Sequence, residues 1–204
     1  MTESAPTTVA LASGSPRRRE LLQTLGLHVQ RVGGDIDETR WPDEPVREYV
    51  QRLAHEKARV GRADARAAGL IVVAGDTVVA LGEQIFGKPQ DAADAQRMLS
   101  ALSDRSHTVH TAVAVHDHRQ CHVECVDSIV TFMPLTPAMI AAYWASGEPQ
   151  DKAGAYGIQG RGGRFVAHLQ GSFSAVMGLP VYETANLLTA CGLDVCSVTT
   201  EAAL

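Results

Sequence analysis

Hydrophobic positions along the chain switch between the two periods that strands and helices produce. Apolar runs over 8–11 and 70–74 predict buried strands, and the alternation over 107–115 and 121–132, joined by a turn at 117–120, predicts a hairpin. Apolar residues spaced by three and four follow five helix-start signals: Ser15-Pro16, Asp43 to Pro45, Asp91, Thr136-Pro137 and Pro180. Because strands interleave with helices and one hairpin is present, the pattern predicts an α/β fold with a mixed sheet.

Composition narrows the class of protein. The chain has 204 residues, 45% hydrophobic and 20% charged, so it can form a core and is long enough for one domain or a tightly fused two-lobed unit. We predict one domain over 1–204, with residues 1–7 and 195–204 peripheral. The net charge of −5 argues against a surface that embraces nucleic acid or an anionic membrane.

The ends and the cysteines indicate a cellular compartment. Residues 1–8 lack the positive charge and apolar stretch of a signal peptide, and prolines or charges interrupt the longest apolar stretches. The chain has only four cysteines, too few for a disulfide scaffold. These features predict a cytoplasmic protein with reduced thiols and no membrane partner.

The first helix begins with three cations where the helix dipole disfavours them. Arg17, Arg18 and Arg19 follow Ser13-Gly14-Ser15-Pro16, and each cation in a first turn costs a few tenths of a kcal/mol. A bound phosphate would turn these repulsions into charge-assisted hydrogen bonds. The alternative is that the long arginine stems fan into solvent. We favour a polyphosphate site.

Two charged residues stand at apolar positions. Lys57 lies about 20° around the helix axis from Val46, within the apolar stripe, so its ammonium must snorkel to solvent or find an anion. Asp76 interrupts the apolar run 71–79, where a carboxylate must be paired, bound to a metal or protonated. Polar residues at the end of a buried strand often line the ligand crevice of an α/β sheet, which makes Asp76 the strongest single candidate.

Several apparent motifs fail on their chemistry. The segment 82–89 resembles a Walker A loop, but Pro89 replaces the hydroxyl residue that would hold Mg²⁺; Lys88 remains a candidate phosphate contact. Strand alternation sends members of one histidine and cysteine cluster to opposite faces, which argues against zinc there. That cluster consists of His116, His118, Cys121, His122 and Cys125.

Together, the ordered motifs resemble the Maf family of nucleoside triphosphate pyrophosphatases from about Val9 to Leu188. The matching segments are Leu11 to Leu22, Glu56-Lys57-Ala58, Gly75 to Val79, Gly87-Lys88-Pro89, Leu102-Ser103 with His107, Asp151 to Gly160, and Gly178-Leu179-Pro180. The resemblance implies a two-lobed fold with a deep cleft, a homodimer, and a divalent cation, Mg²⁺ or Mn²⁺. It also implies hydrolysis of a nucleoside triphosphate to the monophosphate and pyrophosphate.

Within the family, Asp76-Thr77 and the segment 152–160 resemble the branch that acts on dTTP and UTP. The branch acting on 7-methyl-GTP usually has Asp-Gln and a different glycine-rich segment, and it is the alternative within the family. Outside it, a non-catalytic nucleotide-binding regulator of growth or septation and a sugar-phosphate or nucleotide transferase remain open. Pyrophosphate release from dTTP or UTP in the presence of Mg²⁺ distinguishes among these functions.

The residues receive hypothetical roles on this basis. Hydrolysis between the α and β phosphorus atoms needs neutralised charge on the leaving group and an oriented water. Glu38 and Asp76 would hold the metal, Asp76 also being a candidate base; the alternative for Glu38 is that it is one of the solvated acids of its turn. Phosphate contacts would come from Ser13, Arg17, Arg18, Lys57, Lys88 and Gln159, while Thr77 and the segment from Lys152 to Gly160 would contact the base.

Overall fold

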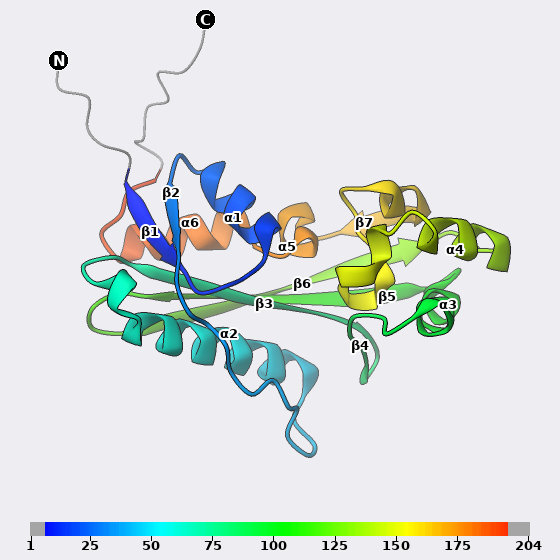
Figure 1. Ribbon diagram of the computed structural model, residues 1–204, viewed down its shortest axis with the longest axis horizontal. Coiled ribbons are helices and arrows are strands. Elements are labelled where there is room, and N and C mark those ends of the chain that lie inside the picture. The colour runs from blue at the N-terminus through cyan, green and yellow to red at the C-terminus, as the bar shows by residue number, and fades with distance from the viewer. Residues whose placement is uncertain (1–6, 196–204) are drawn as a thin grey trace, which may run out of the picture.

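The computed structural model describes residues 7–195; the remaining residues of the termini that were expected to be peripheral, 1–6 and 196–204, lie outside the described part. The described part contains six α-helices and seven strands, together with four short 3₁₀ segments (Figure 1). The strands are β1 Thr8–Leu11, β2 His28–Arg31, β3 Val72–Leu81, β4 Gln84–Phe86, β5 Ser106–His116, β6 Cys121–Phe132 and β7 Val166–Gln170. The helices are α1 Pro16–Gln23, α2 Val46–Ala63, α3 Ala92–Leu102, α4 Pro137–Trp144, α5 Phe173–Met177 and α6 Val181–Ala190, and the 3₁₀ segments are η1 Ala65–Ala67, η2 Glu148–Asp151, η3 Ala153–Ala155 and η4 Arg161–Phe165.

One mixed sheet runs through the molecule in the order β2-β1-β3-β5-β6-β7, with β4 added to β3. β1 is parallel to both β2 and β3, and every other pairing is antiparallel. The predicted mixed α/β sheet and the β5–β6 hairpin are therefore confirmed. The strands β2, β4 and β7 were not predicted, because each has only three to five residues and no sustained alternation.

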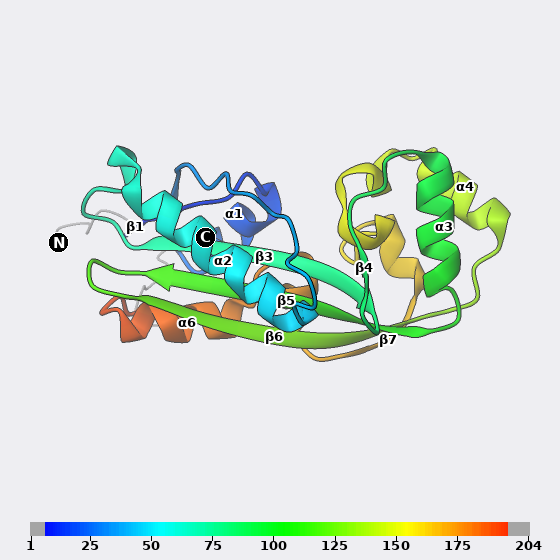
Figure 2. The same ribbon diagram turned by 90° about the horizontal axis from the view of Figure 1, so that it is seen from below.

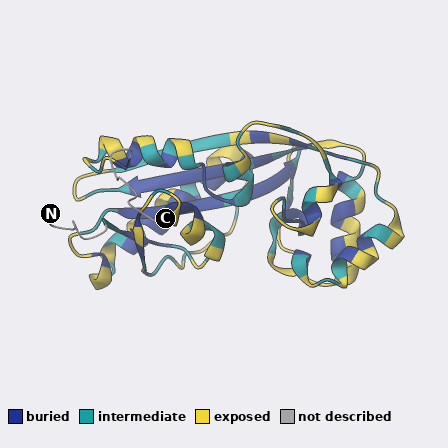
Figure 3. Cartoon of the chain, turned by 90° about the horizontal axis from the view of Figure 1, so that it is seen from above, coloured by how far each residue is buried: buried dark blue, intermediate teal, exposed yellow. Residues whose placement is uncertain are grey.

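Helices cover the sheet in two groups, which form the two lobes. In the first lobe α2 lies on one face and α1, α5 and α6 lie on the other, whereas α3, α4, η2, η3 and η4 gather at the far end of the long strands (Figures 1 and 2). Buried positions run along the strands and the inward helix faces (Figure 3). The predicted two-lobed shape is present. None of the helices in residues 7–195 is long and apolar enough to cross a membrane.

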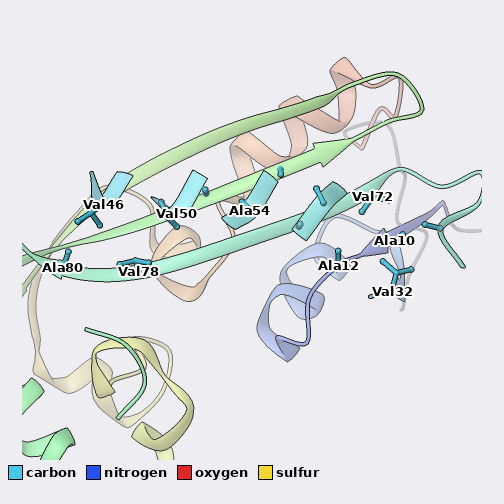
Figure 4. Packing of buried hydrophobic residues seen from close by; sticks show 14 residues of the cluster. Ala10, Ala12, Val32, Val46, Val50, Ala54, Val72, Val78 and Ala80 are labelled. Carbon is cyan, nitrogen blue, oxygen red and sulfur yellow. The ribbon is translucent and has the colours of Figure 1, made fainter. Parts of the chain in front are cut away.

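Between α2 and the sheet, the core of the first lobe consists of small aliphatic side chains. Val46, Val50 and Ala54 of α2 pack on Val72 and Val78 of β3 (Figure 4). The second lobe buries larger rings: Phe132, Tyr143, Tyr156 and Phe165 meet edge to face. Both cores share the central strands, so they hold the lobes together on one frame.

Along one edge of β3, the stretch between its pairings with β1 and β4 has no neighbouring strand, which leaves a gap in the sheet. On one side, β1 pairs with β3 only up to Val73, and β4 pairs with it only from Val79. On the other side, β5 pairs with β3 continuously from Val72 to Ala80. The expectation that Asp76 ends its strand is therefore wrong: β5 keeps the strand extended through Asp76, and it is the neighbouring β1 that ends.

Candidate active site

A cavity of about 960 Å³ lies at this gap, between the two lobes. Side chains reach it from both faces of the sheet, since successive residues of β3 point to opposite sides. Apart from Arg19, its wall includes the residues that the sequence singled out individually for the site: Ser13, Arg17, Arg18, Glu38, Lys57, Asp76, Thr77, Lys88, Lys152 and Gln159. The predicted deep cleft is thus present, and it collects segments that are far apart in the chain.

Arg18 is held by three acceptors. Its Nε donates to Gly178 O at 2.8 Å, and its two terminal nitrogens donate to Ser13 Oγ at 3.1 Å and Thr77 Oγ1 at 3.2 Å. Gly75 leaves room for it, because a Cβ there would stand 3.3 Å from Arg18 Nε. Burial lowers the pKa of Arg18 and the charges of Asp76 and Glu38 oppose that shift, but a guanidinium stays charged in either case.

The three arginines of α1 do not share one direction. Arg17 lines the cavity and faces Asp151 of the second lobe, with 4.0 Å between the nearest charged atoms. Arg19 instead donates to Val29 O on β2 and does not line the cavity. Two of the three arginines therefore reach the cavity. Successive helix residues are turned by about 100° around the axis, so Arg19 lies about 200° from Arg17 and points away.

Lys57 stands between two carboxylates. Its Nζ lies 2.7 Å from Asp76 Oδ1 and 2.5 Å from Glu38 Oε1, and both Lys57 and Asp76 are more than nine-tenths buried. Of the two predicted outcomes for this lysine, snorkelling to solvent or pairing with an anion, the structure therefore shows the pairing. Among the described residues, Asp76 Oδ2 makes no hydrogen bond.

The loop that carries Glu38 is fixed from α2. Tyr49 donates its hydroxyl to Glu38 O at 2.7 Å, and Arg52 donates to Thr39 O at 3.0 Å. Arg52 also forms a two-pronged pair with buried Glu44, whose pKa the Arg52 hydrogen bonds hold below its ordinary value. Glu38 thus faces the cavity from a tethered segment.

The opposite wall is built from 3₁₀ segments and glycines, with Glu148 beneath them. One Glu148 oxygen accepts from Tyr143 and from Gly162 N, and the other accepts from Arg161 N at 2.8 Å. Burial acts to raise the pKa of Glu148, but these three donors outweigh it and hold the pKa below its ordinary value. A Cβ at Gly160 would stand 2.5 Å from the carboxylate, so glycine is required there for close approach.

Side chains on this wall differ in how they are held. Lys152 Nζ donates to Glu148 O and Asp151 Oδ1, both at 2.6 Å. Lys88 and Gln159 are exposed and make no hydrogen bond or ion pair with any residue in the described range 7–195. Beneath the wall, buried His107 contacts the hydroxyl of Tyr156 at 2.9 Å, and burial lowers the pKa of His107 to about 4.

Sequence reasoning did not identify Arg31, which lines the cavity, or Glu148, which carries the glycine-rich wall. Arg31 gave no signal, because nothing local shows that β2 pairs with β1. Glu148 follows Gly147 at the end of a predicted helix, and an acid preceding a glycine-rich run is the signal that could have pointed to it.

The acidic pair fits a hard divalent cation by its donor chemistry. Glu38 and Asp76 offer only carboxylate oxygens, and their contacts with one ammonium show that both reach a common point. Such oxygen donors suit Mg²⁺ or Mn²⁺ rather than a soft metal.

Comparisons with known proteins agree over most of the chain. A family model described as "Maf-like protein" matches residues 8–191. A protein of Chromobacterium violaceum named "dTTP/UTP pyrophosphatase" is 52% identical over 191 residues, which are 92% of this chain and 96% of that protein. A protein of the same name from Xanthomonas euvesicatoria pv. vesicatoria is 54% identical over 185 residues, covering 89% and 97%.

Proposed function

Because the chain belongs to the Maf-like protein family, we propose that it hydrolyses dTTP and UTP to the nucleoside monophosphate and pyrophosphate. The relatives that carry this name match more than four-fifths of the chain at about half identity. The observation within the chain that supports the proposal is the cavity itself, where cations from separate segments surround the Lys57, Asp76 and Glu38 cluster.

The cationic side chains bind the leaving group. Cleavage between the α and β phosphorus atoms places growing negative charge on pyrophosphate, and fixed cations stabilise that charge in the transition state. Arg18 is already oriented by its three acceptors, so little reorganisation accompanies the reaction. Six cationic residues line the cavity and can attract the triphosphate, either by direct contact or, from the rim, at longer range: Arg17, Arg18, Arg31, Lys57, Lys88 and Lys152.

Asp76 serves the attacking water. Its Oδ1 is paired with Lys57, and its Oδ2 is free to accept a proton from a water molecule at the α phosphorus. Glu38 and Asp76 would hold Mg²⁺, which when bound neutralises phosphate charge and makes a water more acidic. Gln159 lines the opposite wall of the cavity and orients the water.

The base meets the glycine-rich wall. Backbone groups of residues 152–160 can approach a pyrimidine edge because several positions lack side chains. Thr77 lines the cavity, but its Oγ1 accepts hydrogen bonds from Arg18 and Thr111. We therefore assign Thr77 to the support of Arg18 rather than to recognition of the base, which revises the role implied by the family resemblance.

A nucleotide panel tests the function. Purified protein with Mg²⁺ is incubated with dTTP, UTP, CTP, GTP and 7-methyl-GTP, and monophosphate, pyrophosphate and orthophosphate are quantified. We expect equal amounts of monophosphate and pyrophosphate from dTTP and UTP and much slower turnover of the others. Binding without products would favour a nucleotide-binding regulator, and preference for 7-methyl-GTP would move the chain to the other branch.

The setting of the reaction is also part of the proposal. We propose that the protein acts in the cytoplasm as a homodimer on free nucleotides, without nucleic acid. Light scattering in solution tests the dimer: a mass twice the 21.7 kDa of the chain supports it, and a monomer contradicts it.

A further inference from the structure

Three side chains with different donor atoms converge at the end of the first lobe that carries the β5–β6 turn. Asp117 lies in that turn, His122 lies near the start of β6, and Cys191 caps the C-terminal end of α6. One ligand atom from each lies within 4.8 Å of the other two. The turn and the end of α6 are neighbours in both ribbon views (Figures 1 and 2).

The ligand atoms of these three residues are free to bind an ion. Asp117 Oδ1 accepts the backbone N–H groups of Arg119 and Gln120 at 2.6 and 2.7 Å, which fixes the carboxylate and leaves its second oxygen open. Within residues 7–195, neither the ring of His122 nor the thiol of Cys191 makes a hydrogen bond. All three side chains are half-buried, so an ion can reach them while the surrounding protein limits competition from water.

The turn that carries Asp117 is held independently of any ion. His116 Nδ1 contacts Asp117 O at 2.6 Å, and Asp117 N donates to Gln120 O across the turn. The backbone of Cys191 is held likewise by carbonyl groups of α6. Ligands mounted on ordered backbone lose little freedom on binding, which favours a defined site over an accidental cluster.

We propose that Asp117, His122 and Cys191 form a site for a borderline-soft divalent cation of the Zn²⁺ type. A carboxylate oxygen, an imidazole nitrogen and a sulfur make a mixed donor set that suits Zn²⁺ and is wrong for Mg²⁺ or Ca²⁺. Three protein ligands leave a fourth tetrahedral position for water. As the metal–sulfur bond forms, the Cys191 thiol releases its proton to solvent.

This site is separate from the cleft. None of its three residues lines the catalytic cavity, and its sulfur donor distinguishes it from the all-oxygen pair of Glu38 and Asp76. A metal here joins the hairpin turn to the last helix and so clamps the outer end of the first lobe. Strand alternation still separates the histidines and cysteines of β6; Cys191, brought in by α6, completes a different set.

Cobalt binding tests the site, because a Co²⁺–thiolate bond gives a charge-transfer absorption that oxygen and nitrogen ligands do not. The full chain without an affinity tag, kept reduced by a phosphine, is titrated with Co²⁺, and Zn²⁺ affinity is then measured by displacement. We expect one equivalent of Co²⁺ with the thiolate band. Cys191→Ser should abolish the band, and His122→Gln should weaken Zn²⁺ binding by at least about tenfold.

Two matched controls make the result decisive. His118→Gln alters an exposed histidine in the same turn and Cys125→Ser a thiol of the same strand, and neither should change the band or the affinity. Thermal unfolding of the wild type should shift upward with Zn²⁺, and that shift should vanish in Cys191→Ser. The proposal is overturned if no thiolate band forms, or if Cys191→Ser and His122→Gln bind Zn²⁺ like the wild type. Loss of binding in Asp76→Asn alone would place the metal in the cleft and overturn it too.

Discussion

The two walls of the cleft are ordered in different ways. On the first-lobe wall three central charged side chains are held: Arg18 by three acceptors, Lys57 by two carboxylates, and Glu38 through a loop tied to Tyr49. On the second-lobe wall the backbone is held by Glu148, whereas the side chains of Lys88 and Gln159 have no partner within the described residues.

This contrast suggests a division of work. Charges that must stabilise a transition state are effective when fixed in advance, because reorientation during the reaction has a free-energy cost. Groups that meet a substrate as it enters can be free. We therefore expect substitutions of Arg18 and Asp76 on the first wall to lower kcat, and substitutions of Lys88 and Glu148 on the second wall to act through KM or through stability.

Asp76→Asn should give the largest loss. An amide cannot accept the proton of water, so kcat for dTTP should fall about a thousandfold, or about 4 kcal/mol, with little change in folding. Steady-state kinetics and circular dichroism measure the two quantities. Asp104→Asn, an exposed change of the same kind outside the cavity, serves as the control. A loss in affinity alone would show that Asp76 binds without taking part in the chemistry.

Neighbouring arginines offer a sharper contrast. Arg18→Ala should lower kcat by about a hundredfold to a thousandfold, because it removes fixed charge from the leaving group. Arg19→Ala should leave kcat within about twofold, since Arg19 contacts Val29 O outside the cavity. Equal effects of the two substitutions would mean that only the overall charge of α1 matters.

His107 beneath the second wall should make stability depend on pH. Its pKa is about 4 in the folded protein against an ordinary 6.5, so protonation favours the unfolded chain. The stabilisation is complete above pH 6.5 and is lost as the pH falls towards 4. Denaturant unfolding should show the wild type losing about 3 kcal/mol more than His107→Gln between pH 7 and pH 4. If the unfolding free energies of the two proteins changed with pH in the same way, His107 would not be a buried neutral imidazole.

Glu148→Gln should act on the second wall as a scaffold defect. A glutamine amide can accept on one side only, so an N–H of Arg161 or Gly162 loses its acceptor, at a cost of about 1–3 kcal/mol in unfolding free energy. KM should rise while kcat stays near that of the wild type. Glu124→Gln, on an exposed position of β6, should change neither. A fall in kcat with KM unchanged would erase the distinction between the walls.

Lys88→Ala should give the smallest effect. An exposed cation at the rim contributes long-range attraction, so kcat/KM should fall by about tenfold at low salt and by less as salt increases. Arg105→Ala removes an exposed cation outside the cavity and should have no effect. A loss that persists at high salt would show that Lys88 contacts the reacting phosphates directly.

Much of the first wall could be predicted because its signals are local conflicts. Lys57 on an apolar helix face and Asp76 inside an apolar strand each require a partner, and each turned out to be the other's. The capping residues Ser15, Asp91 and Thr136 likewise bond the helices that they were expected to begin.

The second wall was harder because its order depends on contacts between distant segments. The sequence signal of Glu148 is weak, an acid before a glycine-rich run, and only folding brings Gly162 N and Tyr143 to it. The length of β3 also escaped prediction, since a carboxylate within a strand is tolerated only when the neighbouring strand stops short. Non-local pairing of this kind leaves no periodic signal along the chain.

The most direct test of the account is hydrolysis of dTTP in water labelled with oxygen-18, followed by mass spectrometry of both products. If fixed cations hold the departing pyrophosphate while water attacks beside Asp76, the label will appear in the monophosphate and the pyrophosphate will carry none. Label in the pyrophosphate, or release of a nucleoside diphosphate and labelled orthophosphate, would contradict this arrangement of the cleft.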